Sequence, residues 1–298
     1  MRDSKKLHPD LQVFLAFGIF QCYLKGLNVR ITETNRTIEE QNSFFNQGYS
    51  QVKGNDYGSM HQWGVAFDVC RNDGTGAYDF TKWIDKVAKI FKKYPLAWGG
   101  DWKGFVDQPH FQMKAYEDSY GGTGKLKKSY KNPDAFAKKW AKSKITEQLA
   151  NLNIAQTKAL LEKKFTTVKT NCGVFAGDKV LKKKGNVKKG NIVYILKDCG
   201  NGVSQIIYLK GSNICTGYIC NIRLNKTLSS FKTIKLSADK KMYDSKTNTV
   251  TGKIVKDTSK VITILKKGSK IQSVSESVSY LRVYVKVDGK WKFGWIKK

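Results

Sequence analysis

Histidine is rare in this 298-residue chain, and two of its three histidines lie in segments that suit a metal site. His61 lies in SMHQWGVAFD, which ends at Asp68, and His110 lies in DQPHF. A catalytic zinc ion typically has three protein ligands with nitrogen or oxygen donor atoms and keeps a fourth position for water. We expect His61 on a loop, Asp68 on the strand that follows and His110 on a later strand. The sequence therefore predicts a Zn²⁺ site assembled from separate segments.

Two further residues suit a hydrolytic reaction at such a site. Zinc with one carboxylate ligand lowers the pKa of its bound water to about 7 and so yields hydroxide at neutral pH. Asp107, three residues before His110, could take the water's proton and return it to a leaving amine. Arg36, in the turn TNRT, could stabilise the oxyanion. Simpler roles are open: a single His or Asp is more often a surface or hydrogen-bonded residue, and Arg36 could pair with Glu39 or Glu40.

These residues form a pattern that resembles the M15 family of zinc peptidases. The shared pattern is Ser59-x-His61 followed by Asp68, and then Asp107 three residues before His110. The family includes D-alanyl-D-alanine carboxypeptidases and the L-alanyl-D-glutamate endopeptidases of bacteriophage endolysins. The resemblance extends over residues 7–115, where NRTIEEQ and WGGDW are also similar to family segments.

What the resemblance implies is a role for each residue. His61, Asp68 and His110 would bind zinc, Asp107 would be the general base, and Arg36 would position or stabilise the substrate carbonyl. The carboxypeptidases usually carry Glu where this chain has Asp107, which is like the endopeptidase branch. The resemblance therefore favours the L-Ala-D-Glu bond of peptidoglycan as the bond that is cut.

The elements that must position these residues follow an α+β pattern over residues 1–125, the expected peptidase domain. Apolar spacing predicts helices over 9–25, 37–47 and 81–94, the second with a capping box from Thr37 and Glu40 and the third ended by Pro95. Alternation predicts strands over 28–34, 65–69 and 106–113. His8 has no comparable context, and we expect it on the surface.

Beyond Gly121, Gly122 and Gly124 the chain changes character. Residues 133–164 are helical in composition, and we expect a helical linker over 126–170. From 171 on, short runs rich in Val, Ile, Tyr and Thr predict small all-β units. KKG recurs at 188–190 and 266–268, and GYI at 217–219 is matched by GWI at 294–296, so the offsets are 78 and 77.

The two offsets indicate tandem copies, at residues 171–228 and 229–298. Their Gly-Tyr/Trp-Ile ends resemble bacterial SH3 domains, which implies two SH3-like barrels that bind cell walls. An enzyme domain, a helical linker and paired barrels together resemble a phage endolysin.

The net charge of +30 is concentrated in the same region, because residues 171–298 hold 27 Lys+Arg against 7 Asp+Glu. Such a polycation fits a polyanionic partner. Only 6 of the 54 basic residues are Arg, the residue whose bidentate fork reads base edges. We therefore expect peptidoglycan and its associated anionic wall polymers, and no nucleic acid, as partners. Codon bias and a solvated surface are the alternative explanation for the lysines.

The chain lacks a run of about 18 to 20 apolar residues, so no membrane span is expected. MRDSKKLHPD does not lead into a secretory signal. We expect synthesis in the host cytoplasm and passage to the wall at lysis through a separate pore. The six cysteines form no CxxC pair; free thiols are expected, and one disulfide within 172–220 stays open. The sequence specifies no oligomeric state.

The preferred interpretation is a phage endolysin-type zinc endopeptidase that lyses a Gram-positive host. One alternative is a D-Ala-D-Ala carboxypeptidase that acts in wall remodelling. Another is a lysine-rich protein that binds walls or nucleic acid and retains an inactive peptidase fold, although the intact set of metal-binding residues argues against decay.

Overall fold

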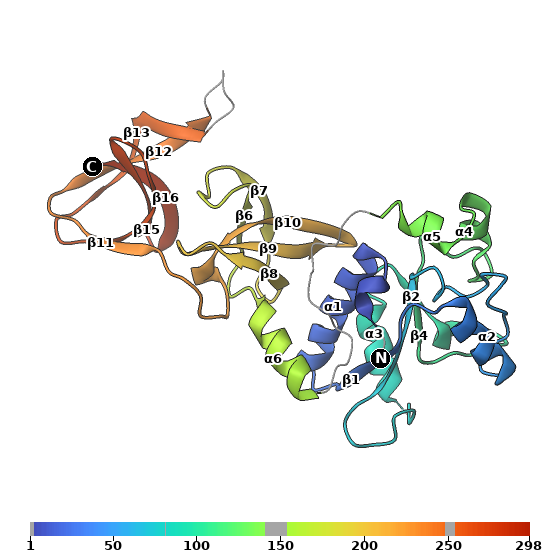
Figure 1. Ribbon diagram of the computed structural model, residues 1–298. Coiled ribbons are helices and arrows are strands. Elements are labelled where there is room, and N and C mark those ends of the chain that lie inside the picture. Colours follow the sequence, from blue (N-terminus) through green and yellow to red (C-terminus); the bar gives the residue numbers. More distant parts are fainter. Residues whose placement is uncertain (1–2, 81, 141–153, 248–253) are drawn as a thin grey trace. The chain divides into compact units, whose positions relative to one another are not determined.

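The computed structural model describes residues 3–80, 82–140, 154–247 and 254–298 (Figure 1). It divides into two compact units, Met1–Lys164 with Lys210–Ile214 and Phe165–Leu209 with Cys215–Lys298. Within the described residues, none of the helices has both the length and the apolar character that crossing a membrane requires.

The first unit is built on an antiparallel sheet with the strand order β1-β2-β4-β3. Its strands are β1 (Val29–Glu33), β2 (Ala66–Arg71), β3 (Leu96–Trp98) and β4 (His110–Met113). Phe91 of helix α3 (Trp83–Phe91) lies against Phe67 and Phe111, with ring centroids 5.2 Å and 5.0 Å away. Because side chains alternate along a strand, Asp68 and His110 point to the opposite face of the sheet. One face therefore packs the core and the other carries the site.

Helix α1 (Pro9–Leu24) is buried on almost every side, as expected for so apolar a segment. Gly18 allows close packing against α3, since a Cβ atom there would lie 2.1 Å from the ring of Phe91. Helix α2 (Ile38–Asn46) begins with the predicted capping box, in which Thr37 and Glu40 bond each other's backbone N–H groups. These helices and the strands beside them confirm the α+β prediction for the N-terminal region.

Some predicted element boundaries were wrong. The strand expected over 106–113 begins only at His110, because Asp107 and Pro109 lie in a turn closed by the bond from His110 N–H to the carbonyl of Asp107. Strand β3 was not expected, since its three residues are too few to show alternation. The predicted start of the third helix, residue 81, lies outside the described residues.

The segment that follows β4 belongs to the first unit and packs against its N-terminal residues. It forms helices α4 (Gly124–Ser129) and α5 (Pro133–Ala137), and the buried ring of Phe136 contacts the rings of His8, Tyr116 and Trp140. The expectation that His8 is a surface residue was wrong. It is half-buried and caps α1, because its Nδ1 accepts the N–H of Asp10 at 3.2 Å.

Only part of the segment expected to be a helical linker can be compared with the prediction. Residues 141–153 lie outside the described residues, and helix α6 (Ile154–Lys164) follows them. In the part of the chain that the structure describes, three short 3₁₀ turns complete the helical elements, at Ser4–Lys6, Gly99–Asp101 and Asn221–Arg223.

Among the described residues, two six-stranded sheets make up most of the second unit. The first holds β5 (Phe165–Thr167), β6 (Cys172–Phe175), β7 (Lys183–Val187), β8 (Ile192–Asp198), β9 (Val203–Lys210) and β10 (Asn213–Cys220). The second holds β11 (Lys232–Lys235), β12 (Lys240–Thr247), β13 (Ile254–Leu265), β14 (Lys270–Glu276), β15 (Tyr280–Val287) and β16 (Lys290–Lys297).

Both sheets have the same topology, with orders β5-β8-β9-β10-β6-β7 and β11-β14-β15-β16-β12-β13. In each sheet the strands, numbered by their order in the chain, are therefore arranged 1-4-5-6-2-3. Each sheet has its own apolar cluster, around Ile206 in the first and Met242 in the second. The all-β character of this region is as predicted. In the strand pairings of the described residues, however, each sheet has two edges and does not close into a barrel.

The repeated glycines occupy matching places in the two sheets. A Cβ atom on Gly217 would lie 2.3 Å from Val174 of β6, and one on Gly294 would lie 2.4 Å from Met242 of β12. The aromatic residue after each glycine also pairs with that neighbouring strand, Tyr218 with Phe175 and Trp295 with Tyr243. The glycines thus permit close packing of the sixth strand on the second. All six cysteines are free thiols.

Candidate metal centre

Two neighbouring strands and one turn bring the three predicted metal-binding side chains together. Asp68 of β2 and His110 of β4 are direct cross-strand partners, so their side chains leave the sheet side by side. His61 lies in the turn before β2, and its carbonyl accepts the backbone N–H groups of Arg36 and Gly64. All three side chains are buried, with exposed fractions of 2% for His61, 9% for Asp68 and 6% for His110.

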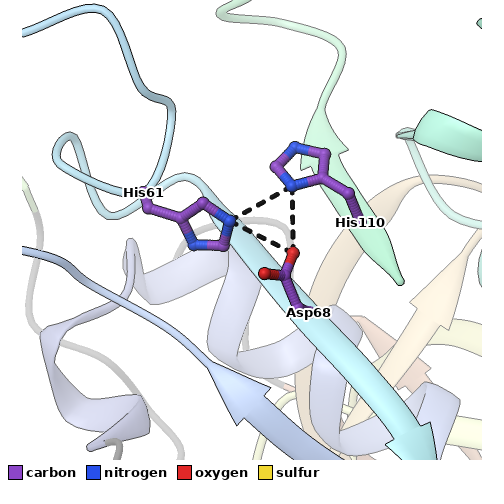
Figure 2. A group of neighbouring side chains, drawn as sticks. All are labelled: His61, Asp68 and His110. Carbon is purple, nitrogen blue, oxygen red and sulfur yellow. Dashed lines mark hydrogen bonds and ion pairs between the residues drawn. The ribbon is translucent and has the colours of Figure 1, made fainter. Parts of the chain in front are cut away.

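The three potential donor atoms form a nearly equilateral triangle (Figure 2). His61 Nε2 lies 3.1 Å from Asp68 Oδ1 and 3.1 Å from His110 Nδ1, and the last two atoms are 3.0 Å apart. Tetrahedral ligands about 2.0–2.1 Å from one zinc ion stand about 3.3–3.4 Å apart. A shift of a few tenths of an ångström would therefore suffice for these atoms to share one ion.

The outer nitrogen of each imidazole fixes which inner nitrogen carries a lone pair. His61 Nδ1 lies 2.7 Å from the carbonyl oxygen of Thr34, which can only accept, so Nδ1 carries the proton. His110 Nε2 lies 2.9 Å from the side-chain oxygen of Gln112 and is protonated for the same reason. In the neutral rings, two nitrogen lone pairs and a carboxylate oxygen therefore converge with no proton between them. Such a set can hold a metal ion.

The electrostatics of the triangle also favour a positive charge. Burial would raise the pKa of Asp68, but the two histidines facing it hold this pKa well below its usual range. Burial lowers the pKa of His61. Burial would also lower the pKa of His110, but its hydrogen bond to Asp68 and the charge of that carboxylate raise it on balance. A cation held between these groups would therefore face a carboxylate that stays ionised.

Arg36 contacts the carboxylate from the side away from the histidines. Its Nη2 donates to Asp68 Oδ2 at 3.2 Å, its Nε to Glu33 Oε2 at 2.9 Å and its Nη1 to Gln41 Oε1 at 3.2 Å. The acidic partners recorded for Arg36 are thus Asp68 and its cross-strand neighbour Glu33, in place of the expected Glu39 or Glu40. A guanidinium has five N–H donors, so two stay available after these three bonds.

Asp107 is held at the edge of the site by the segment WGGDW. Its backbone N–H donates to the carbonyl of Gly99 at 3.0 Å, and a Cβ atom on Gly99 would lie 2.3 Å from the carbonyl oxygen of Asp107. Trp98 Nε1 donates to the carbonyl of Gln108 at 2.8 Å. Burial raises the pKa of Asp107 above the ordinary aspartate value, which suits a group that exchanges protons.

A cleft of about 750 Å³ opens onto the candidate centre. His61, Asp68, His110, Arg36 and Asp107 all line it. Its other walls include the aromatic residues Phe44, Tyr49, Tyr78, Trp102 and Phe105, of which Tyr49 and Tyr78 are largely exposed. The cleft combines a potential metal site, a carboxylate and an open aromatic rim, which together suit the binding and hydrolysis of an extended ligand.

Sequence reasoning missed the residues that support the potential ligands: Thr34, Glu33 and Gln112. Thr34 acts through its backbone carbonyl. Because every residue type has this group, the sequence could not single out Thr34. Gln112 follows His110 by two residues on one strand, so strand alternation could have placed it on the same face.

Comparisons with known proteins connect this site to a family. Residues 53–113, which include all three potential ligands and Asp107, match the peptidase M15 model described as D-alanyl-D-alanine carboxypeptidase. The chain is 36% identical over 106 residues to the peptidoglycan L-alanyl-D-glutamate endopeptidase CwlK of Bacillus subtilis (strain 168). It is 39% identical over 116 residues to the L-alanyl-D-glutamate peptidase of Listeria phage A118.

These matches are partial. They cover 30% and 37% of this chain, and the chain spans 62% and 40% of the two relatives. Among solved structures, the chain is similar to the Serratia marcescens L-Ala D-Glu endopeptidase ChiX, with a TM-score of 0.32 and 23% identity over 38% of this chain and 90% of that one.

Proposed function

We propose that the protein is a zinc-dependent endopeptidase that hydrolyses the L-Ala-D-Glu bond of peptidoglycan stem peptides, because residues 53–113 match the peptidase M15 model. The observation that carries the proposal is the convergence of two imidazole lone pairs and one carboxylate oxygen at the end of a cleft. The two relatives named for this bond support the choice of substrate.

In this proposal, His61, Asp68 and His110 hold the zinc ion. When bound, zinc supplies a Lewis acid and lowers the pKa of a water molecule to about 7. Asp107 accepts a proton from the attacking water and returns it to the amine of the departing D-Glu residue. Its raised pKa brings it closer to the value at which a carboxyl group can both take and release a proton near neutral pH.

Arg36 serves two groups in this proposal. Its Nη2 holds Asp68 Oδ2, so that Oδ1 stays directed at the metal site. Its two unused N–H donors can stabilise the negative charge that develops on the substrate carbonyl oxygen. The stacking of the guanidinium on Phe44, 4.2 Å from the ring centroid, limits its movement.

The cleft favours an endopeptidase over a D-Ala-D-Ala carboxypeptidase. A carboxypeptidase must bind the free carboxylate at the end of its substrate, which calls for a cation beside the scissile bond. Among the described residues that line the cleft, Arg36 is the one cation, and its two unused donors are assigned to the scissile carbonyl, so no second cation is left for a terminal carboxylate. The family description keeps the carboxypeptidase as the second candidate.

For the second unit, we propose two tandem SH3-like modules that bind anionic polymers of the cell wall. The shared strand order and the matching glycines support the duplication. The excess of Lys over Asp and Glu in residues 171–298 supports an anionic partner. The phage origin of one relative supports a role in host lysis from the cytoplasm.

The direct test is mass spectrometry of the peptides released from purified Gram-positive walls. We expect a new amino group on glutamate, loss of activity with a chelator and recovery with Zn²⁺. Release of free D-Ala instead would establish the carboxypeptidase. No cleavage, together with salt-dependent binding to DNA stronger than that to walls, would favour the non-enzymatic alternative.

A further inference from the structure

We propose that Gln112 is a positioning residue that sets the tautomer of His110 and ties this imidazole to the loop at 117–124. The inference rests on the proposed metal site and concerns how the chain keeps one of its ligands ready. It assigns a role to a residue outside the set of metal ligands and catalytic groups described above.

Gln112 is placed by β4 to contact both His110 and the loop. It lies two residues after His110 on the same face of the sheet, and only 1% of it is exposed. Its side-chain oxygen accepts from His110 Nε2 at 2.9 Å. Its side-chain nitrogen donates to Glu117 Oε2 at 2.9 Å and to the carbonyl of Gly121 at 2.8 Å.

The two acceptors on the loop determine which way the amide faces. A carboxylate and a carbonyl oxygen can only accept, so the NH₂ group of Gln112 must point toward Glu117 and Gly121. The amide oxygen is then the atom that faces His110. Since this oxygen only accepts, His110 carries its proton on Nε2 and presents the lone pair of Nδ1 to the candidate metal centre.

The loop is itself held in place. Asp118 accepts the backbone N–H groups of Tyr120, Gly122 and Gly124 at 2.8–2.9 Å. Gly121 has φ +77°, which favours glycine, and it lies on the wall of the cleft. A loop fixed in this way offers Gln112 two stationary acceptors, so the amide has little freedom to turn over.

The two imidazoles differ in this respect. His61 is oriented by the backbone carbonyl of Thr34, which no side-chain substitution removes. His110 depends on a side chain. A substitution at 112 should therefore alter one metal ligand and leave the other unchanged.

The test compares Gln112→Leu, Gln112→Glu and the control Gln12→Leu in the full chain. Gln12 is also a buried amide, but it bonds the carbonyls of Lys5 and Leu7 and contacts no potential ligand. Zinc affinity is measured by competition with a chromogenic chelator. Loss of such a supporting contact typically weakens metal binding about 10–100-fold, and we expect this for Gln112→Leu. Gln112→Glu retains an acceptor oxygen for His110 Nε2 but loses both donor bonds to Glu117 and Gly121, so it should keep the tautomer and still lose part of the zinc affinity. Gln12→Leu should stay within a few-fold of wild type.

The tautomer is read without metal, from the ¹⁵N chemical shifts of the imidazoles above the pKa of His110. In the wild type and Gln112→Glu, His110 should be protonated on Nε2, whereas Gln112→Leu should show a mixture of tautomers. Unchanged zinc affinity and an unchanged tautomer in a folded Gln112→Leu protein would overturn the inference. A wild type that binds no zinc but shows the expected tautomers would instead contradict the proposed function.

Discussion

The chemistry of the candidate site depends on where a few protons reside. Thr34 and Gln112 each accept a hydrogen bond from the protonated outer nitrogen of an imidazole, which leaves the lone pairs of the inner nitrogens to face Asp68. The residue types and spacing could predict the three potential ligands. Few other functions explain why two of the three histidines lie at these spacings from Asp68 and Asp107. They could not predict Thr34, whose contribution is a backbone oxygen, or the contact between Arg36 and Asp68, which depends on the distance across a sheet.

Asp107→Asn separates metal binding from turnover. The amide cannot accept the water's proton, so we expect kcat on wall peptides to fall about 10²–10⁴-fold. Zinc affinity should stay close to that of the wild type, because Asp107 is not one of the three converging groups. Asp101→Asn, which changes an exposed carboxylate paired with Lys92, is the matched control. Full activity in Asp107→Asn would show that the base is another residue.

Arg36→Lys tests the two-part role of the guanidinium. A lysine has three donors on one nitrogen where arginine has five in a planar fork, so it cannot hold Glu33, Gln41 and Asp68 and also keep donors for the substrate. We expect kcat/KM to fall about 10²–10³-fold, with a smaller loss of zinc affinity because Asp68 becomes less constrained. Arg71→Lys, at a partly buried arginine that pairs with Asp73, controls for the change of residue type. Equal activity in the two variants would contradict the role of Arg36.

At the scale of elements, the sequence predicted helices better than the short strands around the site. The apolar spacing of α1 and the capping box of α2 leave clear signals. The three-residue strand β3 and the turn at Asp107 leave almost none, because their geometry comes from packing between WGGDW and the segment after it. The segment WGGDW was recognised in the sequence by its resemblance to family segments. In the structure this segment holds Asp107 in place, through the bonds to the backbone of Asp107 and Gln108.

Gly99→Ala tests whether close packing at Gly99 positions Asp107. A methyl group would meet the carbonyl oxygen of Asp107 at 2.3 Å, so the turn must move. We expect activity to fall at least tenfold with zinc affinity retained, since a misplacement of about 1 Å can cost about 10²-fold in rate. Gly76→Ala is the control, because its Cβ would meet nothing closer than 3.8 Å. If the two variants lose activity equally, close packing at Gly99 does not position the base.

His8 predicts a pH dependence of stability. Burial lowers its folded-state pKa below the ordinary value of 6.5, although Asp10 partly opposes the shift. The unfolded state therefore binds more protons, so this stabilisation is complete above about pH 6.5 and is lost as the pH falls through the folded-state pKa. His8→Asn keeps a capping side chain that does not titrate. Chemical denaturation at about pH 7.5 and pH 5.5 should show a smaller loss of unfolding free energy in the variant, and an equal loss would refute the assignment.

At the scale of the whole molecule, charge and topology divide the chain in the same region. The basic excess lies in residues 171–298, and the same residues form nearly all of the two sheets of shared topology. The sequence could predict the duplication from two short matching segments. It could not predict the strand order, because in each sheet the first strand pairs with the fourth and the sixth pairs with the second, and these strands are far apart in the chain.

Salt should separate the contributions of the two regions. Attraction between exposed lysines and anionic wall polymers is screened over about 10 Å at 0.1 M ionic strength. Raising NaCl from about 50 mM to about 300 mM should therefore weaken binding to walls strongly. Hydrolysis of a soluble stem peptide by the same full-length protein should change little, since it needs only the cleft. Equal salt sensitivity in both assays would contradict a separate electrostatic role for the basic region.

The most direct test of the metal centre is X-ray absorption at the zinc edge of the zinc-loaded protein. The chain holds six free thiols as well as the candidate site, so sulfur ligation is a real alternative. We predict a shell of nitrogen and oxygen at about 2.0–2.2 Å that includes two imidazoles and no sulfur. A zinc–sulfur distance of about 2.3 Å, or a spectrum unchanged by His61→Ala and His110→Ala, would contradict the account.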